Sequence, residues 1–175
     1  MKEFPDNLWA PWRMEYIQSL GRGASDGCFL CDYRDAKEQD AANLVLWRTD
    51  DMMVVMNRFP YTNGHLLIAP LGHKADLEDL AERELAHLMG HTRDAKLLVR
   101  EALGAGGFNI GINFGLCAGA GLPDHLHVHL VPRWDGDTNF MAVLGDVRVI
   151  PEALVKTYER FRATARKLGL PRGSG

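Results

Sequence analysis

Residues 125–131 read His-Leu-His-Val-His-Leu-Val, and polar and apolar residues alternate along the whole stretch. A period of two residues is typical of a half-buried β-strand. The histidines therefore share one face, with neighbouring imidazoles about 6.7 Å apart along the strand, while the aliphatic residues are buried on the other face. A core strand with incidental histidines and a histidine-rich metal tract are the other interpretations. Three of the seven histidines fall on this one face, which argues against coincidence.

A loop of small residues, Gly115 to Gly121, precedes this strand. In such a loop, backbone N–H groups can converge on an anion. A glycine-rich loop followed by imidazoles in a row indicates phosphoryl or nucleotidyl transfer, because an imidazole can attack phosphorus or donate to its oxygens. Cys117 lies in the loop and is a second potential nucleophile. With three histidines beside it, we expect Cys117 to be a small buried residue instead.

The histidine strand resembles the signature of the histidine triad family, in which His-x-His-x-His is followed by two apolar residues. Residues 57–70 (Asn-Arg-Phe-Pro-Tyr-Thr-Asn-Gly-His-Leu-Leu-Ile-Ala-Pro) are similar to the family's first nucleotide-binding hairpin, and Pro-Arg-Trp at 132–134 to its exit. The resemblance covers residues 28–139. Together with Trp-Ala-Pro-Trp-Arg-Met-Glu-Tyr-Ile at 9–17, the chain looks most like the bacterial branch that includes diadenosine tetraphosphate phosphorylases.

The resemblance implies catalysis by the triad, His125, His127 and His129. In this family the middle histidine attacks phosphorus, which assigns His127 as the nucleophile. Its attacking nitrogen must be unprotonated, so we expect the other ring nitrogen to be held by an acceptor, a nearby backbone carbonyl. His129 would donate to a phosphate oxygen, and a purely structural role for His129 is the alternative.

The resemblance also assigns nucleotide binding to Asn57, Phe59, Asn113, Gly119, Gly121 and His129. In the fragile-histidine-triad hydrolases, an Asn at the position of Asn57 holds the ribose hydroxyls, and an Asn that caps the turn is the alternative. Phe59 would form an apolar wall for the base. One position departs from the pattern, because many relatives carry Gln or Ser where this chain has Gly121. Assistance to the leaving group must then come from elsewhere or be weaker.

Cys28 and Cys31 form a Cys-x-x-Cys motif, which needs two further ligands to hold zinc. Zinc-carrying relatives take them from positions that correspond to His73 and His125. The resemblance therefore implies a structural Zn²⁺ held by Cys28, Cys31, His73 and His125, and two buried cysteines without metal are the alternative. His65 then has no metal role, and is either a partner of the triad or an ordinary strand residue.

The net charge is −3, from 20 Lys and Arg against 23 Asp and Glu, so the sequence carries no large basic field and we expect no nucleic-acid partner. With 175 residues and 46% hydrophobic content, the chain is long and apolar enough for one globular domain with a single hydrophobic core. We find no signal peptide and no apolar run long enough to cross a bilayer, and we expect no membrane partner. The few cysteines suit a reducing compartment, which favours a cytoplasmic protein.

Hydrophobic periodicity and turn residues predict an α+β fold, an antiparallel meander sheet packed with one long helix and a C-terminal helix. We expect helices at 11–20, at 76–103 with Asp76 as N-cap, and at 151–168, and strands at 43–48, 52–56, 65–69, 108–114, 125–131 and 147–150. Residues 1–27 would be an N-terminal extension, 28–139 the histidine triad domain, and 140–170 a C-terminal strand and helix packed on that domain.

Particular side chains of the two helices can be assigned in advance. The apolar stripe of the long helix includes Leu77 and Met89, and that of the last helix includes Val155, so we expect these to be buried. His87 and His91 lie four residues apart on the long helix. We expect them on a solvated helix face, and a metal pair is the alternative.

The expected function is cleavage of dinucleoside polyphosphates through a nucleotidyl-histidine, with diadenosine tetraphosphate and inorganic phosphate giving ATP and ADP. Hydrolysis and nucleoside phosphoramidase activity are alternatives on the same fold, and a nucleotide-binding regulator without chemistry is an alternative of another class. The complete triad with both flanking motifs favours an enzyme. The resemblance also implies a homodimer, with the helix at 76–103 contributing to the interface.

Overall fold

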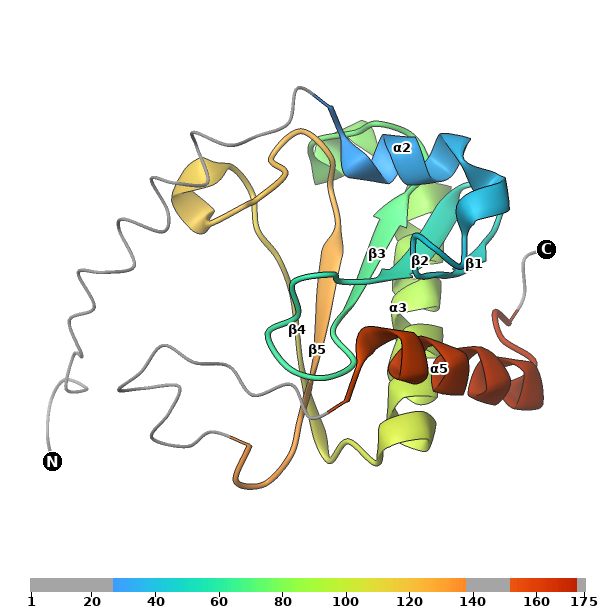
Figure 1. Cartoon of the computed structure of the whole chain (residues 1–175). Helices are drawn as coiled ribbons and strands as arrows, with labels where there is room; N and C mark the ends of the chain where they lie inside the picture. The colour runs from blue at the N-terminus through green and yellow to red at the C-terminus, as the bar shows by residue number, and fades with distance from the viewer. Residues whose placement is uncertain (1–26, 138–151, 173–175) are drawn as a thin grey trace, which may run out of the picture.

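The computed structural model describes residues 27–137 and 152–172, which are built around a five-stranded antiparallel sheet (Figure 1). Its strands lie in the order β1 (Val45–Arg48), β2 (Met52–Met56), β3 (Leu66–Pro70), β5 (Val128–Arg133) and β4 (Gly107–Ile112). Successive hairpins join β1 to β3, whereas β5 is placed between β3 and β4. The expected α+β antiparallel sheet with a long helix is therefore confirmed. The helix expected at 11–20 and the strand expected at 147–150 lie outside the described residues.

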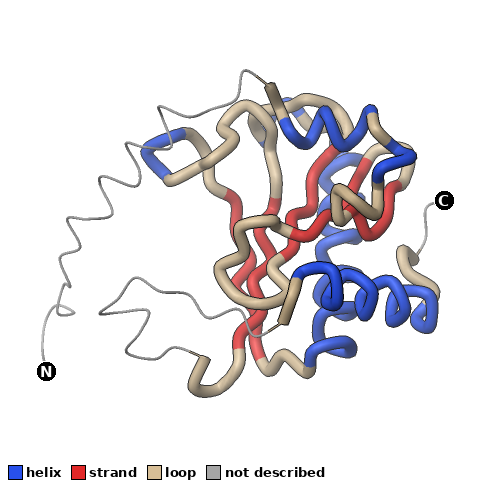
Figure 2. The backbone as a smooth tube through the Cα atoms, viewed as in Figure 1, coloured by secondary structure: helices blue, strands red, loops and turns tan. Residues whose placement is uncertain are grey.

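Helices cover both faces of the sheet (Figure 2). On one face α3 (Glu82–Leu103) and α5 (Leu154–Leu168) pack over the larger hydrophobic cluster, to which β5 contributes Val128 and Leu130. On the other face α2 (Phe29–Asp35) packs over a smaller cluster that includes Leu67. His129 lies opposite Leu67 in the β3–β5 ladder. Because alternate residues of a strand point to opposite faces, His129 lies on the face away from α3.

The β2–β3 hairpin ends at Gly64, where the chain needs a glycine for two reasons. Its φ is +79°, in the left-handed region that side chains rarely adopt. A Cβ at this position would also lie 2.5 Å from Cδ1 of Leu103, at the end of α3. The hairpin thus lies close to the end of α3, and the next residue, His65, is buried just before β3 begins.

The long helix begins later than expected. Asp76 accepts a hydrogen bond from the backbone of Leu77 and caps a short 3-10 turn, η2 (Leu77–Asp79), instead of α3. The chain then becomes extended, and α3 begins at Glu82. The N-cap of α3 is Ala81, whose backbone N–H donates to the side chain of Glu84. Asp76 as N-cap of the long helix was thus wrong, because a second capping pair lies downstream.

Several expected core residues are exposed. Met89 on α3 and Val155 on α5 are each 61% exposed, and Leu77 is at the surface as well. The same two helices also bury polar residues that the sequence pattern did not assign to the core. His91 is buried on α3, so the prediction of a solvated face was wrong for it, and Thr157 is buried on α5.

The ladder of the triad strand begins at Val128, so His125 and His127 precede it. The backbone N–H of Leu126 donates instead to the carbonyl of Lys74, at 2.6 Å. The burial of Leu126, Val128 and Leu130 nevertheless follows the predicted alternation.

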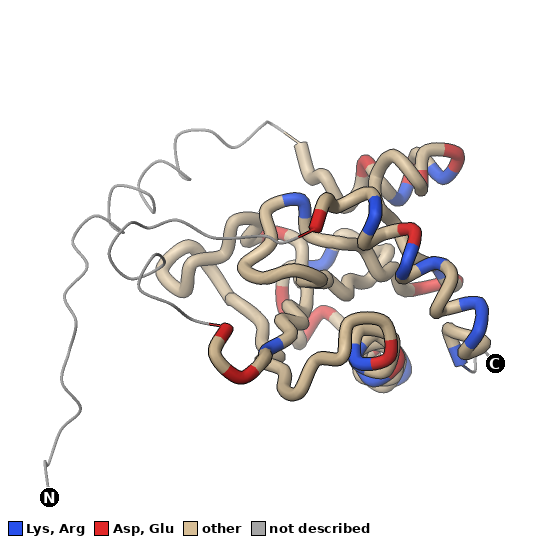
Figure 3. The backbone as a smooth tube through the Cα atoms, turned by 60° about the horizontal axis from the view of Figure 1, so that its bottom comes forward, with Lys and Arg blue, Asp and Glu red and all other residues tan. Residues whose placement is uncertain are grey.

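No helix in the described ranges has both the length and the apolar character needed to cross a membrane. Basic and acidic residues are mixed over this part of the chain (Figure 3).

Candidate active site and metal cluster

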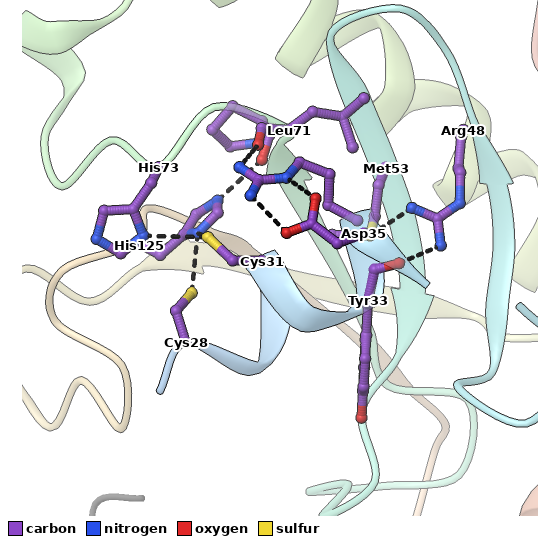
Figure 4. Close-up of polar contacts among 11 residues, drawn as sticks. Cys28, Cys31, Tyr33, Asp35, Arg48, Met53, Leu71, His73 and His125 are labelled. Atoms are coloured by element: carbon purple, nitrogen blue, oxygen red, sulfur yellow. Dashed lines mark hydrogen bonds and ion pairs between the residues drawn. The ribbon is translucent and has the colours of Figure 1, made fainter. Parts of the chain in front are cut away.

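Four potential metal ligands meet beside the triad strand, from three separate segments (Figure 4): Cys28, Cys31, His73 and His125. Their ligand atoms all lie within 4.8 Å of one another. Nδ1 of His125 lies 3.1 Å from Sγ of Cys28 and 3.6 Å from Sγ of Cys31. Nδ1 of His73 lies 3.3 Å from Sγ of Cys31. A tetrahedral zinc site has sulfur–nitrogen edges of about 3.6 Å, so this donor set fits Zn²⁺ in both chemistry and spacing.

The carbonyl of Pro70 orients the ring of His125. Nε2–H of His125 donates to this oxygen at 2.9 Å, which leaves the lone pair of Nδ1 directed at the sulfurs. Burial lowers the pKa of His125, so the ring is neutral, as ligation requires. Burial and the neighbouring Cys28 raise the pKa of the Cys31 thiol to about 11, so a bound cation must displace its proton. His125 thus faces the metal cluster.

His127 has the protonation pattern expected of a nucleophile. Its Nδ1 lies 2.8 Å from the carbonyl oxygen of His125 and donates to it, because a carbonyl can only accept. In the neutral ring, the proton is then on Nδ1 and Nε2 carries the free lone pair. Burial lowers the pKa of His127, which keeps the ring in this neutral form.

His129 is held in the opposite tautomer by His65. The backbone N–H of Tyr61 donates to Nδ1 of His65 at 3.1 Å, so in the neutral ring the proton of His65 is on Nε2. That nitrogen lies 3.0 Å from Nδ1 of His129 and donates to it. His129 therefore carries its own proton on Nε2. Of the two roles left open for His65, the structure shows the partner of the triad.

The rings of His127 and His129 lie close together and stay neutral. Their centroids are 4.8 Å apart at an interplanar angle of 65°, nearer than the strand repeat of about 6.7 Å suggests. The ring of Tyr61 also stacks on His129, at 5.9 Å and 19°. Burial, with a smaller contribution from His127, lowers the pKa of His129 to about 4. One ring thus offers a free lone pair while its neighbour offers an N–H.

The residues expected to bind the nucleoside lie on the β2–β3 hairpin. Asn57 uses both ends of its amide within the hairpin, since Oδ1 accepts from the backbone of Phe59 at 2.9 Å and Nδ2 lies 3.2 Å from Nδ1 of His65. This is the turn-capping geometry. Phe59 itself is 83% exposed, so its ring is free to contact a ligand.

The loop between β4 and β5 is arranged differently from the expected anion cradle. The N–H groups of Ala118, Gly119 and Ala120 donate to carbonyls inside the loop, and so do not converge on a ligand. A Cβ at Gly121 would meet no atom within 4 Å, so open space lies where many relatives are expected to carry a side chain. Asn113 is half-buried at the start of the loop. Cys117 is exposed, which corrects the prediction that it is buried.

Sequence reasoning missed Tyr61. Its side chain stacks on His129 and its backbone fixes the tautomer of His65, but no pattern in the sequence indicates either role. A backbone N–H carries no sequence signal, and a tyrosine in a turn is common.

Residues 38–136 match the HIT domain. An AP-4-A phosphorylase from Mycobacterium tuberculosis is 37% identical over 161 residues, covering 90% of this chain and 82% of that protein. An asymmetrical bis(5'-nucleosyl)-tetraphosphatase from Schizosaccharomyces pombe is 34% identical over 93 residues, covering 53% of this chain and 50% of that protein. A Zn-bound histidine triad family protein from Mycobacterium smegmatis has a similar structure, with a TM-score of 0.66 and 28% identity, covering 82% of this chain and 96% of that one.

Proposed function

Because the chain belongs to the histidine triad (HIT) family, we propose that it is an enzyme that cleaves dinucleoside polyphosphates, with diadenosine tetraphosphate as substrate and inorganic phosphate as acceptor. The observation that carries the proposal is the pair of opposite tautomers, a free Nε2 lone pair on His127 beside an Nε2–H on His129. The name of the Mycobacterium tuberculosis relative, AP-4-A phosphorylase, supports this choice of substrate and acceptor.

In the first half-reaction, Nε2 of His127 attacks the phosphorus next to one adenosine. An N–P bond forms while the P–O bond to the remaining triphosphate breaks, so ATP leaves and AMP stays on His127. Attack needs no external base because this nitrogen carries no proton. His129 donates its Nε2–H to a phosphate oxygen, where negative charge must be stabilised in the transition state.

In the second half-reaction, an oxygen of inorganic phosphate attacks the same phosphorus and the N–P bond breaks. ADP is released and His127 regains its lone pair. The open space at Gly121 supports a phosphate ion as the acceptor, because no side chain fills it. Asn57, Phe59, Asn113 and Gly119 would contact the nucleotide, with Asn57 exchanging its hairpin bonds for those to the ribose.

A second candidate, hydrolysis of the same substrates, is favoured by the Schizosaccharomyces pombe relative, named an asymmetrical tetraphosphatase. Water would then replace phosphate in the second half-reaction and give AMP instead of ADP. The first half-reaction and the residues are the same for both candidates.

We further propose that Cys28, Cys31, His73 and His125 hold one structural Zn²⁺. The ion would tie the start of α2 to the triad strand and so fix the carbonyl of His125 that orients His127. The Zn-bound Mycobacterium smegmatis relative supports this metal. Thiolate ligation suits a reducing compartment, and we place the protein in the cytoplasm.

A homodimer completes the proposal. Within the described ranges, β4 pairs only with β5, so its outer edge is open. Ile110 on this strand and Phe114 just after it are exposed. An open edge with apolar side chains is suited to pairing with a second copy, and the outer side of α3 would contribute to the same interface.

One experiment separates these functions. Purified protein is incubated with diadenosine tetraphosphate, with and without inorganic phosphate, and the products are resolved by chromatography. Phosphate-dependent ATP and ADP support the phosphorylase. ATP and AMP at a rate independent of phosphate would support the hydrolase. Turnover of adenosine phosphoramidates alone would indicate a phosphoramidase, and nucleotide binding without turnover would indicate a regulator.

A further inference from the structure

A cavity of about 320 Å³ lies on the side of α3, away from the histidine triad. Its walls come from the turn between β1 and β2, from the first half of α3, and from Arg172, which follows α5. Because α3 packs on the sheet face opposite His129, this cavity is separate from the candidate active site. Its volume is at the lower end of the range of about 300–1,000 Å³ typical of small-molecule sites.

One wall of the cavity is a preformed hydrogen-bonded chain. The indole N–H of Trp47 donates to Nδ1 of His91 at 3.2 Å, because an indole nitrogen can only donate. Burial lowers the pKa of His91, and in its neutral ring Nε2–H then donates to Oγ1 of Thr49 at 3.3 Å. Thr49 donates to Oδ1 of Asp51 at 3.2 Å, while Nδ1 of His87 lies 2.5 Å from Oδ2. These groups satisfy one another and hold the turn in place.

Three arginines also line the cavity, and one of them, Arg93, pairs with Asp94 at 3.1 Å. The other two are not satisfied in this way. The guanidinium groups of Arg83 and Arg172 make no hydrogen bond or ion pair with other residues in 27–137 and 152–172. The backbone N–H of Arg172 donates to Asp94, at 2.7 Å, and this carboxylate is 1% exposed. This hydrogen bond holds the backbone of Arg172 at the cavity, where its guanidinium has no partner among the described residues. Asp50, exposed on the turn, is the only lining carboxylate without a side-chain partner in the same ranges.

The helix also leaves room for a ligand. Gly90 lines the cavity on α3, and a Cβ there would meet no atom within 4 Å. A larger residue would project into this space. The charged side chains on the walls that lack a partner in the described part of the chain are the two guanidinium groups of Arg83 and Arg172 and the exposed carboxylate of Asp50, so the free charge of the cavity is net positive.

We propose that this cavity binds a phosphate-bearing small molecule, with Arg83 and Arg172 holding the phosphate group. A guanidinium presents forked N–H donors that match two oxygens of one phosphate, and two such groups can serve all of its free oxygens. The phosphate can come from inorganic phosphate or from a mononucleotide. The site does not depend on the chemistry of His127.

The indole N–H signal of Trp47 in a ¹H–¹⁵N NMR spectrum reports on this cavity, because that N–H is bonded to His91 in its wall. The signal is assigned with Trp47→Phe. His127→Ala protein is titrated with inorganic phosphate and, separately, with ADP, at constant pH and at an ionic strength matched with chloride. We expect a saturable shift of the Trp47 signal. If ADP binds more tightly than phosphate, a nucleotide is the source of the phosphate group. If the two bind equally, the source is free inorganic phosphate.

Arg83→Gln and Arg172→Gln should each weaken the apparent affinity about tenfold or more, the loss expected when one charge-assisted contact is removed. Arg100→Gln is the matched control, since Arg100 is an exposed arginine of α3 outside the cavity, and it should behave as the parent protein. A Trp47 signal that neither ligand moves would overturn the proposal. So would a shift with the same midpoint in the Arg83→Gln and Arg172→Gln proteins as in the parent. No turnover is measured, so either result stands apart from the proposed enzyme activity.

Discussion

Nε2 of His65 lies 3.0 Å from Nδ1 of His129, and the backbone of Tyr61 sets the direction of the hydrogen bond between them. Because Tyr61 can only donate through its N–H, His65 must accept on Nδ1 and donate from Nε2. His129 likewise accepts on Nδ1, from His65, so its own proton is on Nε2, the nitrogen away from His65. A backbone group in a turn thus decides which atom of the triad can donate to a phosphate oxygen.

His65→Leu should therefore lower kcat about 10- to 100-fold, less than the 10²- to 10⁴-fold loss typical when an acid–base group is itself removed, because His129 stays in place. The substitution removes the donor that holds His129 in one tautomer, but leaves His127 and its carbonyl partner in place. No residue proposed to contact the nucleotide is replaced, although Asn57 loses its bond to His65, so KM should change less than kcat. Steady-state kinetics with diadenosine tetraphosphate measure both constants.

His65→Gln is the matched variant, because a glutamine amide can still donate to His129. It should recover part of the lost kcat. Equal losses in the Leu and Gln variants would point to a packing role for His65, and a wild-type rate in the Leu variant would remove it from the mechanism altogether.

Burial of His129 should make the protein less stable in mild acid. Its pKa is about 4 in the folded protein, below the ordinary value of 6.5, so the unfolded chain takes up the proton first as pH falls. The stability from the neutral ring is complete above pH 6.5 and is lost as pH falls from there towards 4. Urea unfolding at pH 7.5 and pH 5 should show a lower midpoint at pH 5. This difference should shrink in His129→Gln, and an undiminished difference would show that other groups cause it.

The sequence predicted the sheet and the triad well because both depend on short-range patterns. Alternation placed Leu126, Val128 and Leu130 in the core, and the turn residues around Gly64 marked the hairpin. The proximity of Cys28 and His125, which are 97 residues apart in the sequence, could be predicted only from the family resemblance.

Features that depend on competition between alternatives were not predictable. Asp76 is a good cap by type, yet the helix begins after a second cap at Ala81. Met89 fits the apolar stripe as well as its neighbours but is exposed, whereas His91, two residues further on, is buried and accepts a hydrogen bond from Trp47. Such a partner on a distant strand leaves no mark on the local pattern.

His127→Ala should abolish turnover of diadenosine tetraphosphate while leaving the fold and AMP binding largely intact. The variant loses the nitrogen that attacks phosphorus, and removal of a catalytic group typically costs 10²- to 10⁴-fold. Product formation, circular dichroism and AMP binding are measured on the same preparation. A variant that kept more than about a tenth of the wild-type rate would show that His127 is not the nucleophile.

Protein purified without chelator should contain one zinc per chain, and Cys28→Ser should lose it. A serine hydroxyl is a poor substitute for a thiolate ligand of zinc. Cys117→Ser is the matched control, because Cys117 is exposed in the loop before the triad and lies outside the cluster. It should keep full zinc in elemental analysis. Zinc that is absent from the wild type, or undiminished in Cys28→Ser, would rule out the proposed ligands.

The protein should be a dimer at micromolar concentration, and a charge at the open sheet edge should dissociate it. Ile110 is 45% exposed on β4, the edge strand whose outer side has no partner in the described residues. Ile110→Lys would place like charges next to each other across a symmetric interface and bury a cation, both of which oppose pairing. Val155→Lys is the control, as Val155 is an aliphatic residue that is 61% exposed on α5, away from this edge. Sedimentation velocity should give a dimer for the wild type and Val155→Lys and a monomer for Ile110→Lys. A wild-type monomer would refute the dimer, and a dimeric Ile110→Lys protein would move the interface away from β4.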